Sequence, residues 1–237
     1  MKKITTILFD LDGTLIGMNQ DEFIRLYFHT LLDKLAELGY DRARMYEALE
    51  RSIFCTKHND GRCTNEERFW QTFNEMTDGP HEELNDALIG FYRNEFTEVL
   101  EKSCSLYPRA KDILASVRRK GLRIILATNP LFPAIATHNR IRLGGMDPSD
   151  FEYITTYENS SYCKPNPEYF TELLQKIGVC ADECVMIGND TRDDFSAHAL
   201  GIPVFINTDG LINAGGVDLS LYPHGNADEL IRFIDSL

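Results

Sequence analysis

The stretch that most constrains the fold lies near the amino terminus, where an apolar run ends in two aspartates. Residues 4–9 are apolar and rich in β-branched side chains, which predicts a buried strand. Asp10 and Asp12 follow this run and precede Gly13. Asp-Gly between apolar residues also predicts a β-hairpin. In an open α/β sheet, however, ligands bind at the carboxyl ends of strands, where two carboxylates need a cation or a proton between them.

The rest of the chain predicts a sheet interrupted by one helical segment. Further short apolar runs predict strands over 122–127, 151–157, 184–187 and 204–206, with helical patterns between them. This alternation is typical of parallel βαβ units. Residues 19–105 carry helical patterns only, and we expect helices over about 23–38, 41–54, 65–76 and 82–100, with a polar turn over 55–62. The sequence therefore predicts an α/β sheet with a helical insertion.

Composition indicates a globular protein and excludes several partners. The 237 residues are 43% hydrophobic and 26% charged, with a formal net charge of −13. Nucleic acids and anionic membranes call for basic patches, so we expect neither as a partner. The apolar run after Lys3 is too short for a signal peptide, and no stretch reaches the roughly 18 apolar residues of a membrane span. We expect a cytoplasmic location.

The six cysteines are scattered along a chain that is too long to need disulfide bonds. Cys55, His58 and Cys63 could suggest a zinc site. They lack a closely spaced cysteine pair and a second half, so we expect free thiols and no structural zinc.

Other polar residues follow the predicted strands in a similar way. Thr128 and Asn129 end the 122–127 run, Asp190 follows the 184–187 run with Asp194 four residues later, and Lys164 precedes a helix. Taken singly, Thr128 or Asp190 could cap a helix and Lys164 could be a surface lysine. Taken together, at corresponding ends of parallel strands, they predict one acidic crevice. A hard divalent cation such as Mg²⁺ would satisfy its carboxylates; without one, some of them must hold protons.

These residues form an ordered pattern that resembles the four motifs of the haloacid dehalogenase (HAD) superfamily. The pattern is Asp10-Leu11-Asp12-Gly13-Thr14, then Thr128, then Lys164, then Gly188-Asn189-Asp190 with Asp194. A chance D-x-D-G-T is on the order of one in a hundred thousand per position, so the first motif is specific. The others persuade by their order. The resemblance implies a Rossmann-like doubly wound parallel sheet (the HAD fold) over 1–16 and 106–237, with an α-helical cap of the C1 type over 17–105.

The resemblance also implies site roles. Asp10 would be the nucleophile that forms an aspartyl-phosphate, Asp12 the general acid and base, and Lys164 a catalytic cation. Phosphoryl oxygens would be bound by Thr14, Thr128 and Asn129. Mg²⁺ would be held by Asp10, Asp190 and the main-chain carbonyl of Asp12. Asp194 would not bind the metal directly but would orient a metal-bound water or Lys164. Many relatives have Gly-Asp where this chain has Gly188-Asn189-Asp190, so Asn189 is an alternative ligand to Asp190.

The implied activity is Mg²⁺-dependent hydrolysis of a small phosphorylated metabolite. A phosphomutase, a carbon–halogen hydrolase and a non-catalytic binding protein are the alternatives. The halogen hydrolases of the superfamily need no metal, which the crowded acids argue against. The polar loop over 55–62, with Lys57, His58 and Arg62, could contact the substrate or be a solvated turn. Neither the substrate nor the oligomeric state follows from the sequence.

Overall fold

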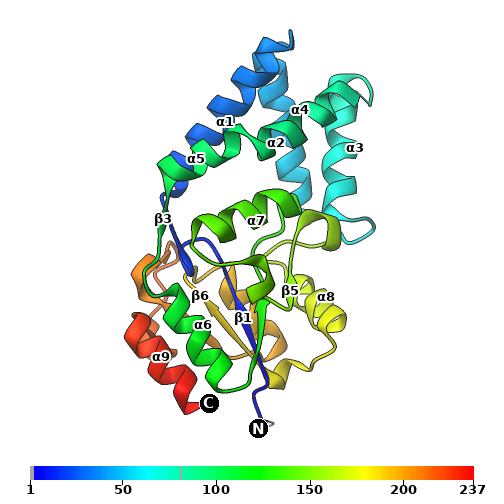
Figure 1. Ribbon diagram of the computed structural model, residues 1–237. Coiled ribbons are helices and arrows are strands. Elements are labelled where there is room, and N and C mark those ends of the chain that lie inside the picture. Colours follow the sequence, from blue (N-terminus) through cyan, green and yellow to red (C-terminus); the bar gives the residue numbers. More distant parts are fainter. Residues whose placement is uncertain (1–2, 81) are drawn as a thin grey trace.

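One six-stranded sheet carries the polar residues singled out above. The structure, a computed structural model, describes residues 3–80 and 82–237. The strand order is β5-β4-β1-β6-β7-β8 and every pairing is parallel (Figure 1). The strands are β1 Thr6–Phe9, β4 Arg123–Leu126, β5 Tyr153–Ile154, β6 Cys184–Gly188, β7 Val204–Asn207 and β8 His224–Gly225.

The order of the strands creates a crevice at β1. From β1 the chain forms β4 and β5 on one side, then returns to form β6, β7 and β8 on the other. Neighbouring connections therefore leave in opposite directions around β1, which is the place where doubly wound sheets bind ligands. The predicted Rossmann-like α/β fold is confirmed.

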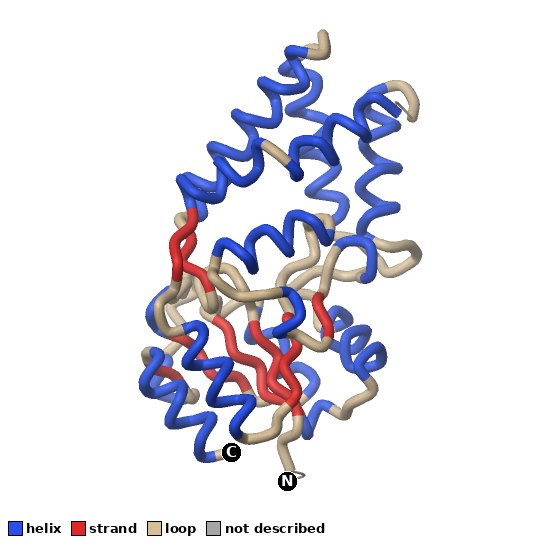
Figure 2. Tube along the Cα trace, in the orientation of Figure 1, coloured by secondary structure: helices blue, strands red, loops and turns tan. Residues whose placement is uncertain are grey.

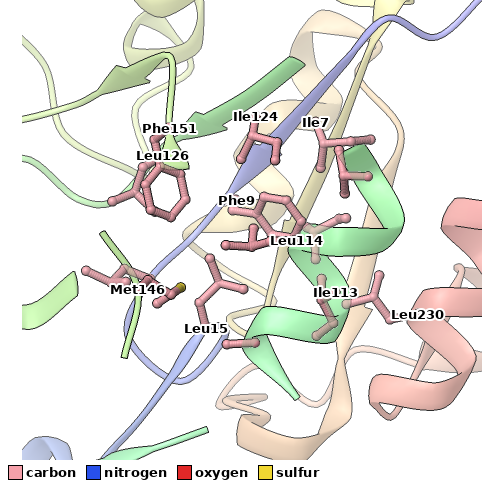
Figure 3. Packing of buried hydrophobic residues seen from close by; sticks show 14 of the residues in the cluster. Ile7, Phe9, Leu15, Ile113, Leu114, Ile124, Leu126, Met146, Phe151 and Leu230 are labelled. Carbon is pink, nitrogen blue, oxygen red and sulfur yellow. The ribbon is translucent and has the colours of Figure 1, made fainter. Parts of the chain in front are cut away.

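Alternate residues of β1 pack into separate cores on the two faces of the sheet. Ile7 and Phe9 join a cluster with α6 (Ala110–Arg119) and α9 (Ala227–Ser236), as Figure 3 shows. Leu8 points to the opposite face and packs with α8 (Glu168–Ile177). Successive side chains of a strand point to opposite faces, so a strand that is buried on both sides is apolar throughout.

Helices α1–α5 lie beyond the carboxyl ends of the strands, at the end of the molecule opposite both termini (Figures 1 and 2). The segment leaves through β2 (Ile16–Met18) and returns through β3 (Cys104–Leu106), which pair antiparallel. A third apolar cluster holds these helices together and extends to α7 (Ala134–Leu143) through Ala136. The helices are α1 Gln20–Glu37, α2 Arg42–Lys57, α3 Asn65–Thr77, α4 Glu82–Arg93 and α5 Glu95–Ser103.

Several local predictions need correction. The helix expected over 82–100 is two helices, because Asn94 leaves helical geometry (φ −119°, ψ −80°) while its side-chain amide donates to the Gly90 carbonyl. The helical pattern between the strands predicted over 184–187 and 204–206 forms a 3₁₀ helix over Asp194–Leu200. Strands β2, β3 and β8 were not predicted, since two or three residues are too few to show a period.

The described residues contain neither a membrane-spanning helix nor a disulfide bond. None of their helices combines the length and the apolar character that a membrane crossing requires. The cysteines, all of which lie in this part of the chain, are free thiols, as predicted.

We predict that Leu8→Ala lowers the free energy of unfolding by about 2–5 kcal/mol, because it opens a cavity in a fully buried core. Urea denaturation measures this change. The matched control is Leu221→Ala, whose side chain is 74% exposed and whose loss should cost less than about 0.5 kcal/mol. Equal losses in the two variants would contradict the assignment of Leu8 to the core.

Candidate active site

Asp10 lies where β1 ends between its two neighbours. Its backbone N–H donates to the Ile187 carbonyl at 2.9 Å, and the Ala127 N–H donates to Phe9. The strand register therefore continues to the aspartate and directs its side chain to the edge of the sheet. Asp10 is 8% exposed, so its carboxylate has lost most of its water. A charged group in this position needs partners.

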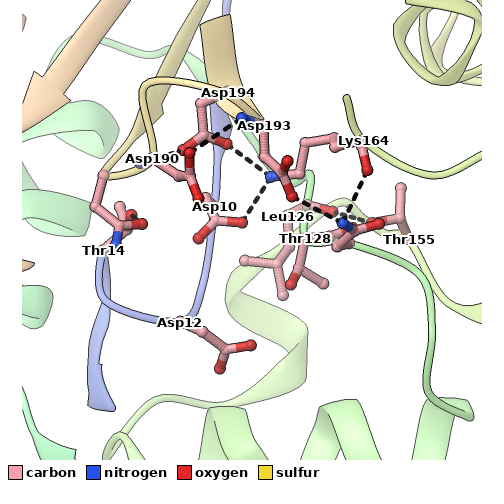
Figure 4. Close-up of polar contacts among 12 residues, drawn as sticks. Asp10, Asp12, Thr14, Leu126, Thr128, Thr155, Lys164, Asp190, Asp193 and Asp194 are labelled. Atoms are coloured by element: carbon pink, nitrogen blue, oxygen red, sulfur yellow. Dashed lines mark hydrogen bonds and ion pairs between the residues drawn. The ribbon is translucent and has the colours of Figure 1, made fainter. Parts of the chain in front are cut away.

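A buried lysine supplies that partner. Lys164 Nζ lies 2.7 Å from Asp10 Oδ1 and 2.7 Å from Asp194 Oδ1, and all three side chains are nearly inaccessible (Figure 4). The second oxygen of Asp194 accepts the backbone N–H of Asp190 at 3.0 Å. One ammonium therefore neutralises two carboxylates. The sequence predictions placed Asp10, Lys164 and Asp194 in one crevice, and the structure brings them together.

One cation between two acids leaves a negative charge in a dry site. Burial raises the pKa of Asp10 to about 7; the Lys164 ammonium opposes this, and the neighbouring carboxylates Asp194 and Asp12 add to it. Burial alone would lower the pKa of Lys164, but Asp10 and Asp194 outweigh it and hold that pKa well above its ordinary value. Lys164 is thus a permanent cation, while Asp10 binds a proton near neutrality.

Two glycines make this close packing feasible. Gly188 ends β6, and a Cβ at this position would lie 2.0 Å from Asp194 Oδ2. Gly13 has φ +83°, which L side chains rarely adopt, and a Cβ there would lie 2.3 Å from Asn189 Nδ2. Glycine in the first and fourth motifs therefore has a steric cause: a side chain comes against each backbone.

The alternative ligands of the fourth motif differ in their contacts. Asn189 is 2% exposed; its amide donates to the Gly210 carbonyl, and its oxygen accepts the Thr14 hydroxyl at 2.9 Å. Asp190 is half-buried, and its Oδ1 accepts the backbone N–H groups of Arg192 and Asp193. No described residue donates to Asp190 Oδ2. Asp190 therefore has an oxygen available for a ligand, whereas Asn189 is committed to the fold.

Thr14 differs from its predicted position. It is 1% exposed, donates to Asn189, and is absent from the described lining of the cavity beside Asp10. The prediction that its hydroxyl contacts a phosphoryl group does not match this geometry. Thr14 instead joins the first motif to the fourth, since Thr14 and Asn189 bond across the end of β1.

Thr128 and Asn129 both line the cavity, as their position at the end of β4 predicts. The Thr128 carbonyl accepts the hydroxyls of Thr155 and Tyr169, which fixes the loop. The Asn129 amide donates to the Lys164 carbonyl and to Asp193 Oδ2, while its buried Oδ1 has no described partner. Asn129 therefore holds the loop that carries Lys164 against the loop after β6.

Arg140 is the main residue that sequence reasoning missed. It lies on α7, is 1% exposed, and pairs through Nη1 with Asp12 Oδ2. Its guanidinium also lies 5.0 Å from the centre of the Phe132 ring. Its Nε and Asp12 Oδ1 are buried without a described partner. The only local signal was an arginine on the buried face of a short helix.

These side chains surround a cavity of about 490 Å³ between the sheet edge and the helices. Asp10, Asp12, Lys164 and Asp190 line its floor, and α1 and α2 form the opposite wall. The volume is in the range of small-molecule sites.

The polar loop predicted over 55–62 contributes less to this cavity than its composition suggests. Helix α2 continues to Lys57, which lines the cavity. His58 stacks instead on Phe54, and Arg62 pairs with Asp60. The prediction of substrate contacts from His58 and Arg62 therefore does not match this geometry.

The residues present suit a hard cation. Asp10 Oδ2 and Asp190 Oδ2 both lack a described hydrogen-bond donor and belong to side chains lining the same cavity. Carboxylate and carbonyl oxygens are the ligands that Mg²⁺ prefers. One oxygen of the Asp12 carboxylate is paired with Arg140, and the resemblance implies that Asp12 contributes its main-chain carbonyl. This donor set fits the metal without a third side chain.

We predict that Lys164→Met lowers the free energy of unfolding by about 3–5 kcal/mol at pH 8, because two buried carboxylates lose their cation. The loss should shrink as the pH falls towards 5, where Asp10 holds a proton. Urea denaturation without divalent cations measures both values. Lys176→Met, which removes a half-exposed lysine paired with Glu172, should cost less than about 1 kcal/mol. A deficit that grows on acidification would contradict this account.

Known proteins are similar to this chain in sequence or in fold. A pyrophosphatase PpaX of Bacillus pumilus (strain SAFR-032) is 29% identical over 198 residues, covering 84% of this chain and 80% of the relative. A HAD phosphatase from Thermococcus onnurineus has a TM-score of 0.59 at 20% identity and covers 98% of both chains. The HAD-hydrolase YfnB from Bacillus subtilis, in a form bound to magnesium, has a TM-score of 0.56 at 18% identity, covering 99% of this chain and 100% of that one.

The two structural likenesses concern the fold. The model of the haloacid dehalogenase-like hydrolase family matches residues 4–201, a range that includes all four motifs. This match confirms both the resemblance inferred from the motifs and the prediction of a hydrolase: the chain belongs to the haloacid dehalogenase-like hydrolases.

Proposed function

We propose that this hydrolase is a Mg²⁺-dependent phosphatase that cleaves a small phosphate monoester through an aspartyl-phosphate. The observation that carries the proposal is the buried group of Asp10, Lys164 and Asp194 at the end of β1, which borders a cavity. Phosphoryl transfer needs a positioned nucleophile and neutralisation of the phosphoryl charge, and little else from a protein. The relatives with phosphatase and pyrophosphatase names support this choice.

The proposed reaction has two steps, in which Asp10, Asp12 and Lys164 have separate roles. An Asp10 carboxylate oxygen attacks phosphorus in line, and the ester P–O bond breaks as Asp12 gives its proton to the leaving oxygen. Asp12 then accepts a proton from water, which attacks the same phosphorus. Phosphate leaves and the Asp10 carboxylate is restored. Throughout, the Lys164 ammonium balances charge at the reacting centre.

Arg140 orients Asp12 in this scheme. The ion pair holds the Asp12 carboxyl group at the cavity wall, where it gives a proton to the leaving oxygen and later accepts one from water. Magnesium, held by Asp10, Asp190 and the Asp12 carbonyl, would supply positive charge to the phosphoryl oxygens. The magnesium-bound state of the relative YfnB supports this choice of ion.

The helical segment would act as a cap. In this proposal residues 17–105 form a unit that covers the site of the domain formed by 1–16 and 106–237. The cavity wall contributed by α1 and α2 supports the assignment, because those helices face the catalytic side chains directly. A cap that excludes water protects an acyl-phosphate from unproductive reactions.

We predict that Asp10→Asn lowers kcat for acetyl phosphate or a simple phosphate ester by at least about a thousandfold, because the nucleophile is lost. The measurement is phosphate release in the presence of Mg²⁺, because Mg²⁺ in such sites is bound by one or two carboxylates and by the phosphate of the substrate. The control is Asp86→Asn, an exposed carboxylate on α4. Turnover of Asp10→Asn near the unmodified rate would refute the nucleophile. A sugar phosphate isomer in place of free phosphate would indicate a phosphomutase.

We also predict that Mg²⁺ binding releases a proton below neutrality. Asp10 has a pKa of about 7 in the metal-free protein, and the metal binds only its carboxylate form. The apparent Kd should therefore fall by up to about tenfold per pH unit between pH 5.5 and 7, and level off above that range. Titration calorimetry in two buffers with different ionisation enthalpies counts the protons. Asp10→Asn should release none from this position; an unmodified protein whose affinity does not change with pH would contradict the metal assignment.

A further inference from the structure

The wall of the cavity opposite the catalytic residues is made by one face of each of two helices. Residues of α1 and α2 reach it at the three- and four-residue spacing of a helix face. Those of α1 are Gln20, Phe23, Ile24, Tyr27 and Phe28. Those of α2 are Tyr46, Glu50, Ile53 and Lys57. The two faces are mostly apolar or aromatic, and Leu131 and Phe132 line the same cavity, with Phe132 packed against Phe23 of α1.

Parts of this wall are exposed although their side chains are large and apolar. Ile24 is 52% exposed and Tyr46 is 41% exposed. Other residues of the same helices, such as Leu31 and Leu49, are fully buried in the helical core. Helices α1 and α2 therefore carry large apolar side chains that are not buried by packing within the helical core. Exposed apolar surface inside a concave site is typical of a surface that a ligand covers.

Most of the charged residues that line the cavity lie on its floor. Among the described lining residues the cations are Lys57, Arg140 and Lys164. Arg140 is paired with Asp12, and Lys164 is shared by two carboxylates. On the α1 and α2 wall the charged residues are Glu50 and Lys57, one of each sign. A leaving group with charges of its own, such as the second phosphate of pyrophosphate, would meet little positive charge on that wall.

We propose that the natural leaving group is apolar, so that the substrate is the phosphate monoester of an alkyl or aryl alcohol. The phosphoryl group lies beside Asp10, and the apolar part lies between α1 and α2 against Ile24, Ile53 and Phe132. This assignment rests on the proposed phosphatase function and names its substrate class. The aromatic side chains are themselves packed together, with the rings of Phe23 and Phe132 edge to face at 5.9 Å, so the wall is formed before a ligand arrives.

The first test compares alkyl esters of similar chemical reactivity. Hexyl phosphate, methyl phosphate and glycerol 3-phosphate differ mainly in the apolar surface and hydroxyl groups of the leaving alcohol. We expect kcat/KM for hexyl phosphate to exceed the other two by at least about tenfold, since each methylene in an apolar pocket is worth about 1–3 kcal/mol. Pyrophosphate should be hydrolysed more slowly than hexyl phosphate. Equal or reversed preferences would overturn the inference while leaving the phosphatase function intact.

A binding experiment separates the two levels of the proposal. Calorimetry with the Asp10→Asn variant and Mg²⁺ measures the Kd of hexyl and methyl phosphate without turnover. Tighter binding of hexyl phosphate by at least about tenfold supports the apolar site. If the unmodified protein hydrolysed neither acetyl phosphate nor any ester, that result would overturn the phosphatase function alone. Equal Kd values would overturn the apolar leaving group.

A matched pair of variants tests the location. Ile24→Asn makes the wall polar at an exposed position, and Leu38→Asn makes the same kind of change at a 55% exposed residue at the end of α1, outside the described lining. Thermal unfolding verifies that both fold. We expect Ile24→Asn to reduce the hexyl-to-methyl ratio of kcat/KM by about fivefold or more, and Leu38→Asn to leave it unchanged. An unchanged ratio in both variants would overturn the assignment of the wall.

Discussion

The ammonium of Lys164 between Asp10 and Asp194 is the interaction on which the site depends. Its three members come from the end of β1, the loop that precedes α8, and the segment after β6. Without the lysine, two desolvated carboxylates would face each other; without the carboxylates, a lysine that is 1% exposed would be a buried, unpaired cation. The strand order brings the end of β1 and the segment after β6 together. The ion pairs of Lys164 with Asp10 and Asp194 then hold the loop before α8 against them.

The molecule separates two tasks between its layers. The edge of the sheet provides the charges, with Asp12 and Arg140 adding a second ion pair beside the first. Helices α1 and α2 provide a surface that is mostly apolar and carries one charge of each sign. Phosphoryl groups resemble one another in all esters, whereas alcohols differ. In the proposed function, a division of this kind would let the alcohol be recognised by residues that take no part in the chemistry.

Local patterns in the sequence predicted the strands that are buried on both faces, because an apolar run of β-branched residues such as 4–9 is read without knowledge of its neighbours. The motif residues Asp10 and Asp190 were found in the same way, through their positions at strand ends, and Lys164 and Asp194 through their place in the order of the motifs. Arg140 was not, because its partner Asp12 lies 128 positions away. Thr14 was assigned to the substrate because its bond to Asn189, 175 positions away, leaves no local trace either.

The pairing of β2 with β3 has a consequence for the ancestry and redesign of this chain. Ile16 faces Leu106 and Met18 faces Cys104, so the two ends of the helical segment enter and leave side by side. A tight turn joining these strands would close the sheet portion without moving β1 or β4. Exchange of the whole helical segment between relatives is thus geometrically simple, and its main cost is the apolar surface of α7 that would lose its cover. If these helices contact the leaving group as proposed, the exchange of one continuous stretch of gene would change the specificity.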